Sequence, residues 1–357
     1  MDLIPHPGIL KAFGLREEDF RLQRFESGHI NNTVRLRNIH GDRDYVLQRI
    51  NTRVFTDPWT IVRNQRMAAT FLKEHFPKYL FLAAIPTQDG SDLYETRDEF
   101  WRLVPFIPHS IALDQADSPK QAFEAATQFG RLTRLLSGID LYDFSPTIPN
   151  FHNLTLRYSA FQDAIRNARE ERREYAEELT ESFLRYSFIA VQFEQLKTDR
   201  EFRDRLVHHD TKINNVLLDE KSFEGICVID LDTLMPGKII SDLGDMVRTY
   251  TSPVSEEEQD YSRIVIREPY YEALMKGYLS ELGEDLTPTE KNLLFYAGQF
   301  MVYMQGIRFL TDFLNSDIYY PIRYPEHNFV RAKNQLTLLE QLNQKEKALR
   351  HIIDSCL

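Results

Sequence analysis

The chain has 357 residues, of which 42% are hydrophobic, 12% aromatic and 27% charged, as is usual for a soluble globular protein. The formal net charge of -11 argues against a general affinity for nucleic acid or anionic membranes, and no run of about eighteen apolar residues predicts a membrane span. Two cysteines, Cys227 and Cys356, are too few for a disulfide framework or a zinc site, and the sequence opens without a secretory pattern, so we expect free thiols and a cytoplasmic protein.

The first part of the chain carries the signals of a small β-sheet. Segments rich in apolar and β-branched residues alternate with turns that contain Gly, Asn and Asp. Asp57 is a fair N-cap and Pro58 suits the first helical position, so a helix is expected from there to about His75. The expected strands are 20–25, 32–37, 45–50, 83–85 and 100–104.

Helical patterns dominate from Ser118 onward. A dense mixture of charges predicts one long solvated helix from Arg166 to about Glu181. Two short apolar runs, 215–218 and 226–229, interrupt the helices, and the polar turn with a Gly between them predicts a β-hairpin. Further helices are expected over 270–281, 289–314 and 326–349.

Four polar residues around this hairpin have the order and spacing of a phosphotransferase centre. Asp210 is followed by Lys212 and Asn215, and Asp230 ends the next strand. In the transfer of a phosphoryl group to a hydroxyl, Asp210 would accept the hydroxyl proton and Lys212 would lie against the moving oxygens. Asn215 and Asp230 supply hard oxygen ligands for Mg²⁺, and Asp232 is a candidate for a second metal or water ligand.

The hairpin itself makes this assignment geometrically sensible. It would bring Asn215, at the start of one strand, close to Asp230, at the end of the antiparallel partner, so that one metal ion could reach both. The alternative for each residue alone is structural, because Asp and Asn also cap helices and fill turns. The joint spacing of four such residues favours the catalytic interpretation.

A centre of this kind predicts a protein kinase-like α+β fold with two lobes. Residues 1–103 would form a nucleotide-binding lobe with a small antiparallel β-sheet and one helix, and 104–108 would form the hinge. Residues 109–357 would form a large, mostly α-helical lobe with the catalytic loop and the acceptor site. The hinge of such folds binds adenine, so Val104 and Phe106 are expected to contact ATP.

Two further segments of the small lobe are candidates for the nucleotide phosphates. Gly28 and His29 lie in a turn between strands, where backbone N–H groups can bind phosphate oxygens, although such a turn is often only a turn. The third strand should supply a cation, and it contains Gln48 and Arg49. Only one of the two can face the cleft. The need for a positive charge at the phosphates favours Arg49, whereas the usual strand pattern of three apolar residues followed by a cation favours Gln48.

With these motifs, the chain resembles the aminoglycoside phosphotransferase and choline kinase superfamily, and within it the bacterial N-acetylhexosamine 1-kinases. The resemblance implies ATP- and Mg²⁺-dependent phosphorylation of the anomeric (C1) hydroxyl of N-acetylglucosamine or N-acetylgalactosamine. It also implies that Asp242 braces the catalytic loop, and we expect a monomer or weak dimer. The segments that carry the resemblance are 28–33, 45–51, 208–215, 228–233 and 308–314.

Candidates for the acceptor pocket are less sharply defined. They are polar or aromatic residues that could offer hydrogen bonds or a ring face to a sugar, and they could equally be packing or surface residues. His29 in the phosphate turn could also reach the acceptor. The other candidates are His152, Asn153, Arg157, Arg308, Tyr319 and Tyr320.

Two other functions fit parts of the same sequence. A kinase of this fold could act on choline, an aminoglycoside or homoserine, and the acidic run 255–258 could then bind a cationic acceptor. Such runs usually belong to solvated loops. A pseudokinase that only binds a partner is disfavoured by the complete set of catalytic residues, and the altered third-strand cation is its only support.

Overall fold

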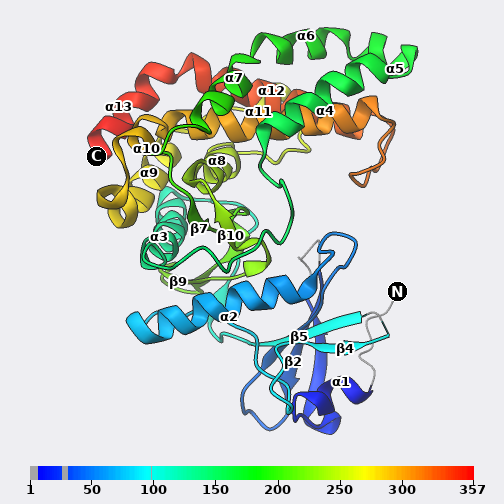
Figure 1. Cartoon of the computed structure of the whole chain (residues 1–357), viewed down its shortest axis with the longest axis vertical. Coiled ribbons are helices and arrows are strands. Elements are labelled where there is room, and N and C mark those ends of the chain that lie inside the picture. Colours follow the sequence, from blue (N-terminus) through cyan, green and yellow to red (C-terminus); the bar gives the residue numbers. More distant parts are fainter. Residues whose placement is uncertain (1–6, 26–30, 98) are drawn as a thin grey trace.

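The computed structural model describes residues 7–25, 31–97 and 99–357, and it has the expected α+β architecture. Figure 1 shows a small lobe built on a β-sheet and a larger lobe built mainly of helices. None of the helices in the described ranges is long and apolar enough to cross a membrane.

The small lobe is a five-stranded antiparallel sheet in the order β1-β2-β3-β5-β4. One face of the sheet packs against α1 (Pro7–Ala12) through buried side chains that include Leu36, Leu47 and Leu103. Strand alternation turns the side chains between these residues toward the opposite face. The strands are β1 (Phe20–Arg24), β2 (Asn32–Asn38), β3 (Tyr45–Arg49), β4 (Tyr94–Thr96) and β5 (Glu99–Pro105).

Helix α2 (Pro58–His75) begins and ends as the sequence predicts. The Asp57 carboxylate accepts a hydrogen bond from the Trp59 N–H at 3.1 Å, which satisfies one of the free donors of the first turn. In Figure 1 the helix lies between the sheet and the large lobe. Its Asn64 amide donates to the Leu234 carbonyl at 3.1 Å, so α2 is tied directly to the large lobe.

One predicted strand of the small lobe is wrong. Residues 83–85 form only a single bridge, between Ile85 and Leu103. Pro86 follows at once and has no N–H, so it cannot donate to a continuing ladder. Strand β4 adds the edge of the sheet instead, and β5 continues through Pro105 into the expected hinge.

The core of the large lobe is built around the almost entirely buried helix α11 (Leu294–Leu314). Helices α8 and α12 pack against it, and α3 packs against α9. The other helices are α3 (Pro119–Leu135), α4 (Leu154–Asn167), α5 (Glu170–Tyr175), α6 (Glu177–Arg185), α7 (Phe188–Leu196), α8 (Ile239–Tyr250), α9 (Glu268–Leu282), α10 (Pro288–Asn292), α12 (His327–Gln344) and α13 (Glu346–Cys356).

The single helix predicted from 166 to 181 is also wrong, because the chain breaks there twice. Ala168 adopts an extended conformation after α4, and a second break at Ala176 separates α5 from α6. Helix α5 buries no residue, whereas α6 buries Phe183, whose ring centroid lies 6.3 Å from that of Phe161 in α4. The breaks fold the chain back so that the two apolar faces meet.

Two small sheets frame the predicted catalytic segment. The expected hairpin is formed by β8 (Val216–Asp219) and β9 (Gly225–Val228), and β6 (Ser110–Ile111) joins β8. Strand β7 (Arg205–Val207) pairs with β10 (Met235–Gly237). The residues between β7 and β8 and those between β9 and β10 therefore emerge beside one another, which is the geometry that the proposed centre needs.

Candidate active site

Asp242, in the first turn of α8, holds the loop that follows β7. Its carboxylate accepts the backbone N–H groups of His208 at 3.0 Å and His209 at 2.7 Å. The Thr211 hydroxyl donates to the Asp242 carbonyl at 2.6 Å. Burial raises the pKa of Asp242 to about 6, even though His208 and both backbone donors favour the ionised form. The contacts confirm that Asp242 braces the loop.

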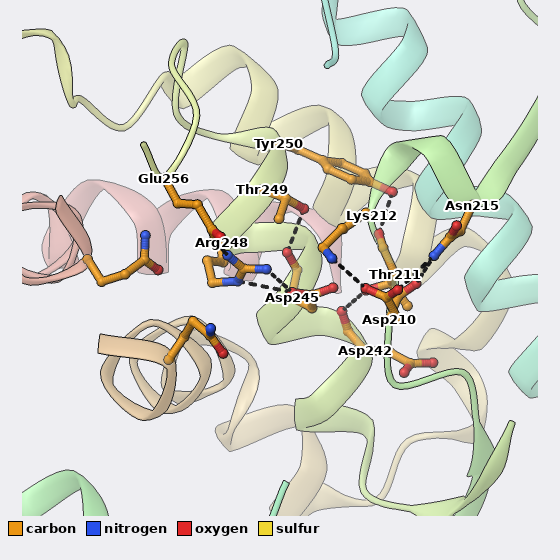
Figure 2. A network of polar contacts seen from close by, with 12 residues as sticks. Asp210, Thr211, Lys212, Asn215, Asp242, Asp245, Arg248, Thr249, Tyr250 and Glu256 are labelled. Carbon is orange, nitrogen blue, oxygen red and sulfur yellow. Dashed lines mark hydrogen bonds and ion pairs between the residues drawn. The ribbon is translucent and has the colours of Figure 1, made fainter. Parts of the chain in front are cut away.

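Asp210 lies in this loop with two of its predicted partners (Figure 2). Lys212 Nζ is 3.2 Å from one carboxylate oxygen, and the Asn215 amide donates to the other at 3.1 Å. Burial alone would raise the pKa of Asp210, but the charges of Lys212 and His208 outweigh it and hold the pKa below its ordinary value. Asp210 is therefore an ionised carboxylate at neutral pH and can accept a hydrogen bond from a hydroxyl.

A second ion pair lies beside Lys212. Figure 2 shows Arg248 between Asp245 and Glu256, with the nearest atoms 2.9 Å and 2.7 Å apart. Asp210 is the main cause of the raised pKa of Lys212, and Asp245 adds to it. Lys212 thus stays charged between Asp210 and Asp245. Sequence reasoning missed Asp245 and Arg248, because a carboxylate and an Arg in a helix carry no distinct signal.

The hairpin brings Asn215 and Asp230 to the same place. Val216 pairs with Val228, and the Ile229 N–H donates to the Asn215 carbonyl at 2.8 Å. Asp230 has a φ of 54°, in the left-handed region, where Asp is tolerated better than most residues. Asp230 follows β9 by two residues and directly precedes the 3-10 turn Leu231–Thr233, which contains Asp232.

The residues around Asp230 suit a divalent cation. Burial and the nearby charges of Asp232 and Asp210 raise the pKa of Asp230 to about 6, so negative charge has accumulated there. A bound cation would relieve it. In the described ranges no group of three or more His, Cys, Asp or Glu residues is arranged to hold a metal ion. Proteins usually bind Mg²⁺ through one or two carboxylates, with phosphate and water as the other ligands.

Gln48 and Arg49 point to opposite faces of the small sheet. Gln48 Oε1 accepts a hydrogen bond from Arg102 Nε at 2.8 Å, on the face toward the large lobe. Arg49 binds Glu99 at 2.6 Å on the other face. The buried Arg102 also forms an ion pair with Asp232. Arg102 was missed because its position beside Gln48 depends on the pairing of β3 with β5, which the sequence does not display.

The remaining nucleotide candidates lie around the hinge. Val104 in β5 pairs with Val46 in β3 and is half-buried. The ring of Phe106 lies under the guanidinium of Arg35, with 3.7 Å between the Arg35 Cζ atom and the ring centroid. Gly28 and His29 fall outside the described residues.

Most of the acceptor candidates form one cluster beside the catalytic loop. The Arg308 Cζ atom lies 5.6 Å from the ring centroid of Tyr320 and 5.7 Å from that of Phe151. Phe151 stacks on His152 with 4.3 Å between the ring centroids. Arg157 donates to the Phe151 carbonyl at 3.2 Å. These four candidates, with Phe151, therefore lie together although they come from distant segments.

Tyr319 and Asn153 lie differently. The side chain of Tyr319 is exposed, and its backbone N–H and that of Tyr320 both donate to Asp312 at 2.9 Å. Asp312, which the sequence did not single out, thereby fixes the loop that carries both rings. Asn153 caps α4, since its side chain accepts the Leu156 N–H at 3.3 Å. The structure thus gives Asn153 a structural contact.

The acceptor cluster carries positive charge. Burial, followed by the charge of Arg308, lowers the pKa of Arg157. Burial also lowers the pKa of His152 well below its ordinary value, and His209 and Arg308 add to this effect. His152 Nδ1 and Arg157 Nε are buried without a hydrogen-bond partner among the described residues. The cluster therefore offers polar groups that a ligand rich in oxygen could satisfy.

The acidic run 255–258, by contrast, is neutralised. Each of its carboxylates forms an ion pair with an Arg, so the run has little charge left for an ammonium group. The pairs are Glu256–Arg248 at 2.7 Å, Glu257–Arg331 at 2.6 Å and Glu258–Arg263 at 2.6 Å.

Comparison with known proteins agrees with this arrangement. Residues 21–284 match the family model described as phosphotransferase enzyme family. The chain belongs to the phosphotransferase enzyme family. The match includes nearly all of the five-stranded sheet, the loop that follows β7 and the hairpin.

Solved structures share the fold across almost the whole phosphotransferase. An aminoglycoside phosphotransferase from Alicyclobacillus acidocaldarius is 12% identical with a TM-score of 0.65, and the match covers 99% of this chain and 98% of that one. A microcompartment-associated aminopropanol kinase is 14% identical with a TM-score of 0.62, covering 95% and 96%. A spectinomycin phosphotransferase in complex with ADP and spectinomycin is 12% identical with a TM-score of 0.59, covering 95% and 96%. The protein kinase-like fold is confirmed.

Proposed function

We propose that this phosphotransferase transfers the terminal phosphoryl group of ATP to the C1 hydroxyl of an N-acetylhexosamine, N-acetylglucosamine or N-acetylgalactosamine, with Mg²⁺ as cofactor. The observation that carries the proposal is the contact of Asp210 with both Lys212 and Asn215, on the loop that the hairpin places beside Asp230. Independent structural residues would have no reason to converge in this order.

The chain's own residues divide the chemistry between them. Asp210 receives the hydrogen bond and then the proton of the acceptor hydroxyl, and Lys212 neutralises the phosphoryl oxygens. When bound, ATP supplies the phosphoryl group and Mg²⁺ neutralises its charge. Asn215 and Asp230 would hold the metal, with Asp232 close by. In phosphoryl transfer this positioning of charges supplies most of the rate enhancement.

The nucleotide would lie between the lobes. In this proposal residues 1–103 form the nucleotide-binding lobe, 104–108 form the hinge, and 109–357 carry the catalytic loop and the acceptor. Val104 and Phe106 would contact adenine, and Gln48 lies on the face of the sheet that is turned toward Asp232.

The charge of the acceptor cluster supports a neutral sugar over a cationic acceptor. Arg157 and Arg308 are donors only, so they suit hydroxyl and carbonyl oxygens, and they repel an ammonium group. The ring of Tyr320 adds an apolar face on which the C–H groups of a sugar can pack. Choline or an aminoglycoside would need free carboxylates, but those of the run 255–258 are already paired with Arg residues.

A screen of acceptors tests the proposal. ADP release is coupled to a spectroscopic readout for both N-acetylhexosamines, the unmodified hexoses, choline, homoserine and aminoglycosides, and phosphorus NMR locates the transferred group. We expect turnover with an N-acetylhexosamine and phosphate on C1. Turnover confined to an amine-bearing acceptor would replace the proposed substrate. If the protein binds nucleotide but no acceptor promotes ADP release above the rate of an Asp210→Asn control, a pure binding module becomes the better interpretation.

A further inference from the structure

We propose that Arg102 in β5, and not a residue of the third strand, supplies the positive charge of the small lobe for the nucleotide phosphates, and that Gln48 holds it in place. This inference rests on the proposed nucleotide site. It assigns a role to a residue that the catalytic motifs do not include, and it explains how the protein can dispense with a cation at Gln48.

The pairing of β3 with β5 places Arg102 on the face toward the large lobe. Val46 is opposite Val104, and Gln48 is opposite Arg102. Val104 and Arg102 are two residues apart, so they project from the same face with their Cα atoms about 7 Å apart. If adenine lies at Val104, Arg102 is one step farther from the hinge, in the direction of Asp232. The phosphates must follow the same direction to reach Asp230.

The guanidinium of Arg102 is oriented but not saturated. Its Nε donates to Gln48 and its Nη1 binds Asp232, while Nη2 has no partner in the described part of the chain. The Gln48 amide donates in turn to the Thr33 hydroxyl at 3.2 Å, which fixes the orientation of its acceptor oxygen. A planar guanidinium that is held in this way has a remaining N–H edge suited to phosphate oxygens.

Arg102 also takes the place of an ion pair that the fully described elements β3 and α2 do not form with each other. In protein kinases a Lys of the third strand is paired with a Glu from the helix of the small lobe. Here the cation comes from β5 and its carboxylate, Asp232, comes from the large lobe. Helix α2 contributes Gln65, whose amide donates to Asp232 at 3.3 Å, and Asn31 donates to the other oxygen at 2.7 Å. The ion pair therefore joins the two lobes.

Arg49 cannot fill this role from its observed position. It lies on the opposite face of β3, where it binds Glu99 at 2.6 Å, and its Cζ atom is 5.8 Å from the ring centroid of Trp101. To reach the face of Gln48, the strand would have to shift by one residue, which would expose the buried Leu47.

Calorimetry tests the inference by measuring the binding of ADP and adenosine to the full chain. EDTA is present so that no metal contributes. Arg102→Met is expected to weaken ADP binding about 10- to 100-fold, the range for losing a hydrogen bond to a charged group, and to leave adenosine binding unchanged. Arg102→Lys, which keeps the charge, should fall between Arg102→Met and the wild type. Arg66→Met is the matched control, because Arg66 forms its ion pair with Asp92 elsewhere in the small lobe.

The double variant Arg102→Met/Asp232→Asn separates phosphate binding from a purely structural ion pair. If Arg102 only neutralises Asp232, removing both charges restores ADP affinity and overturns the inference; if it contacts phosphate, the affinity stays low. Equal ADP binding by the wild type and Arg102→Met also overturns the inference about Arg102, as does loss of ADP binding in Arg49→Met instead. Either result leaves the proposed function unaffected. A wild-type chain that binds neither ADP nor adenosine overturns both.

Discussion

We expect the stability of the protein to depend on pH through His209, which lies in the loop that follows β7. Its side chain is 5% exposed, and Nδ1 lies 3.2 Å from the carbonyl oxygens of Val207 and Thr233, so this nitrogen carries the proton of the neutral ring. A Cβ atom at Gly237 would lie 2.3 Å from Nε2, which explains the glycine and leaves little room for a partner to a second N–H. Burial lowers the pKa of His209 from 6.5 to about 4.

The sign and size of the effect follow from this pKa. The imidazole of His209 is neutral in the folded state, and the unfolded chain protonates it more readily. The contribution of His209 to the free energy of unfolding is therefore fully present above pH 6.5 and is lost as the pH falls toward 4. For these two pKa values the loss in unfolding free energy is about 2 kcal/mol at about pH 5. Carboxylates titrate in the same range, so the wild type alone cannot isolate the contribution of His209.

Urea denaturation of the wild type and His209→Asn isolates the contribution of His209 to the free energy of unfolding. The two proteins are compared between about pH 7 and pH 5. Asn tolerates the left-handed φ of 67° at this position and does not titrate. His209→Asn is expected to be the less stable protein near pH 7, because it loses ring packing, and the difference should narrow by about 2 kcal/mol near pH 5. His351→Asn, at an exposed position of α13, serves as the control and should follow the wild type. A constant difference across the range would refute the reasoning.

Three further predictions concern the reaction. Asp210→Asn should leave ATP affinity within a few-fold but lower kcat by about 100-fold or more in steady-state assays, because it removes the proton acceptor; near-normal kcat would contradict that role. Asp230→Ala should weaken Mg-ATP binding much more than metal-free ATP binding in calorimetry, and equal losses would argue against metal ligation. Arg308→Met should raise the KM for the N-acetylhexosamine about 10-fold or more with little change in the KM for ATP; unchanged KM values would place the acceptor elsewhere.

Local signals in the sequence were sufficient to predict helix starts, the hairpin and the loop that carries Asp210. The caps of α2 and α3 depend on neighbouring residues, and Asp57 and Ser118 both make the hydrogen bonds that their types predict. The hairpin also follows from local patterning, since its two strands are joined by a short polar turn. The order Asp210, Lys212 and Asn215 lies within one loop, so sequence spacing nearly fixes the distances between them.

Local signals failed where packing between distant segments decides the conformation. The charged stretch around α5 has helix-forming residues throughout, yet the chain breaks at Ala176 because Phe183 must reach Phe161. Residues 83–85 have the composition of a strand, but Pro86 and the pairing available at Leu103 reduce them to one bridge. Propensity is worth only a few tenths of a kcal/mol per residue, so burial of one aromatic side chain can override it.

The sequence by itself determined that a carboxylate, a lysine and an amide would share one loop beside an acidic residue, because all of them lie within one short segment. Only the tertiary structure decided which charged side chains lie on the face of the small sheet toward the large lobe and which side chains gather around Phe151. Arg102 reaches Asp232 across 130 residues, and Arg308 of α11 meets Phe151, which lies in the turn before α4. Such contacts depend on strand register and on helix packing, and neither leaves a mark in the order of neighbouring residues.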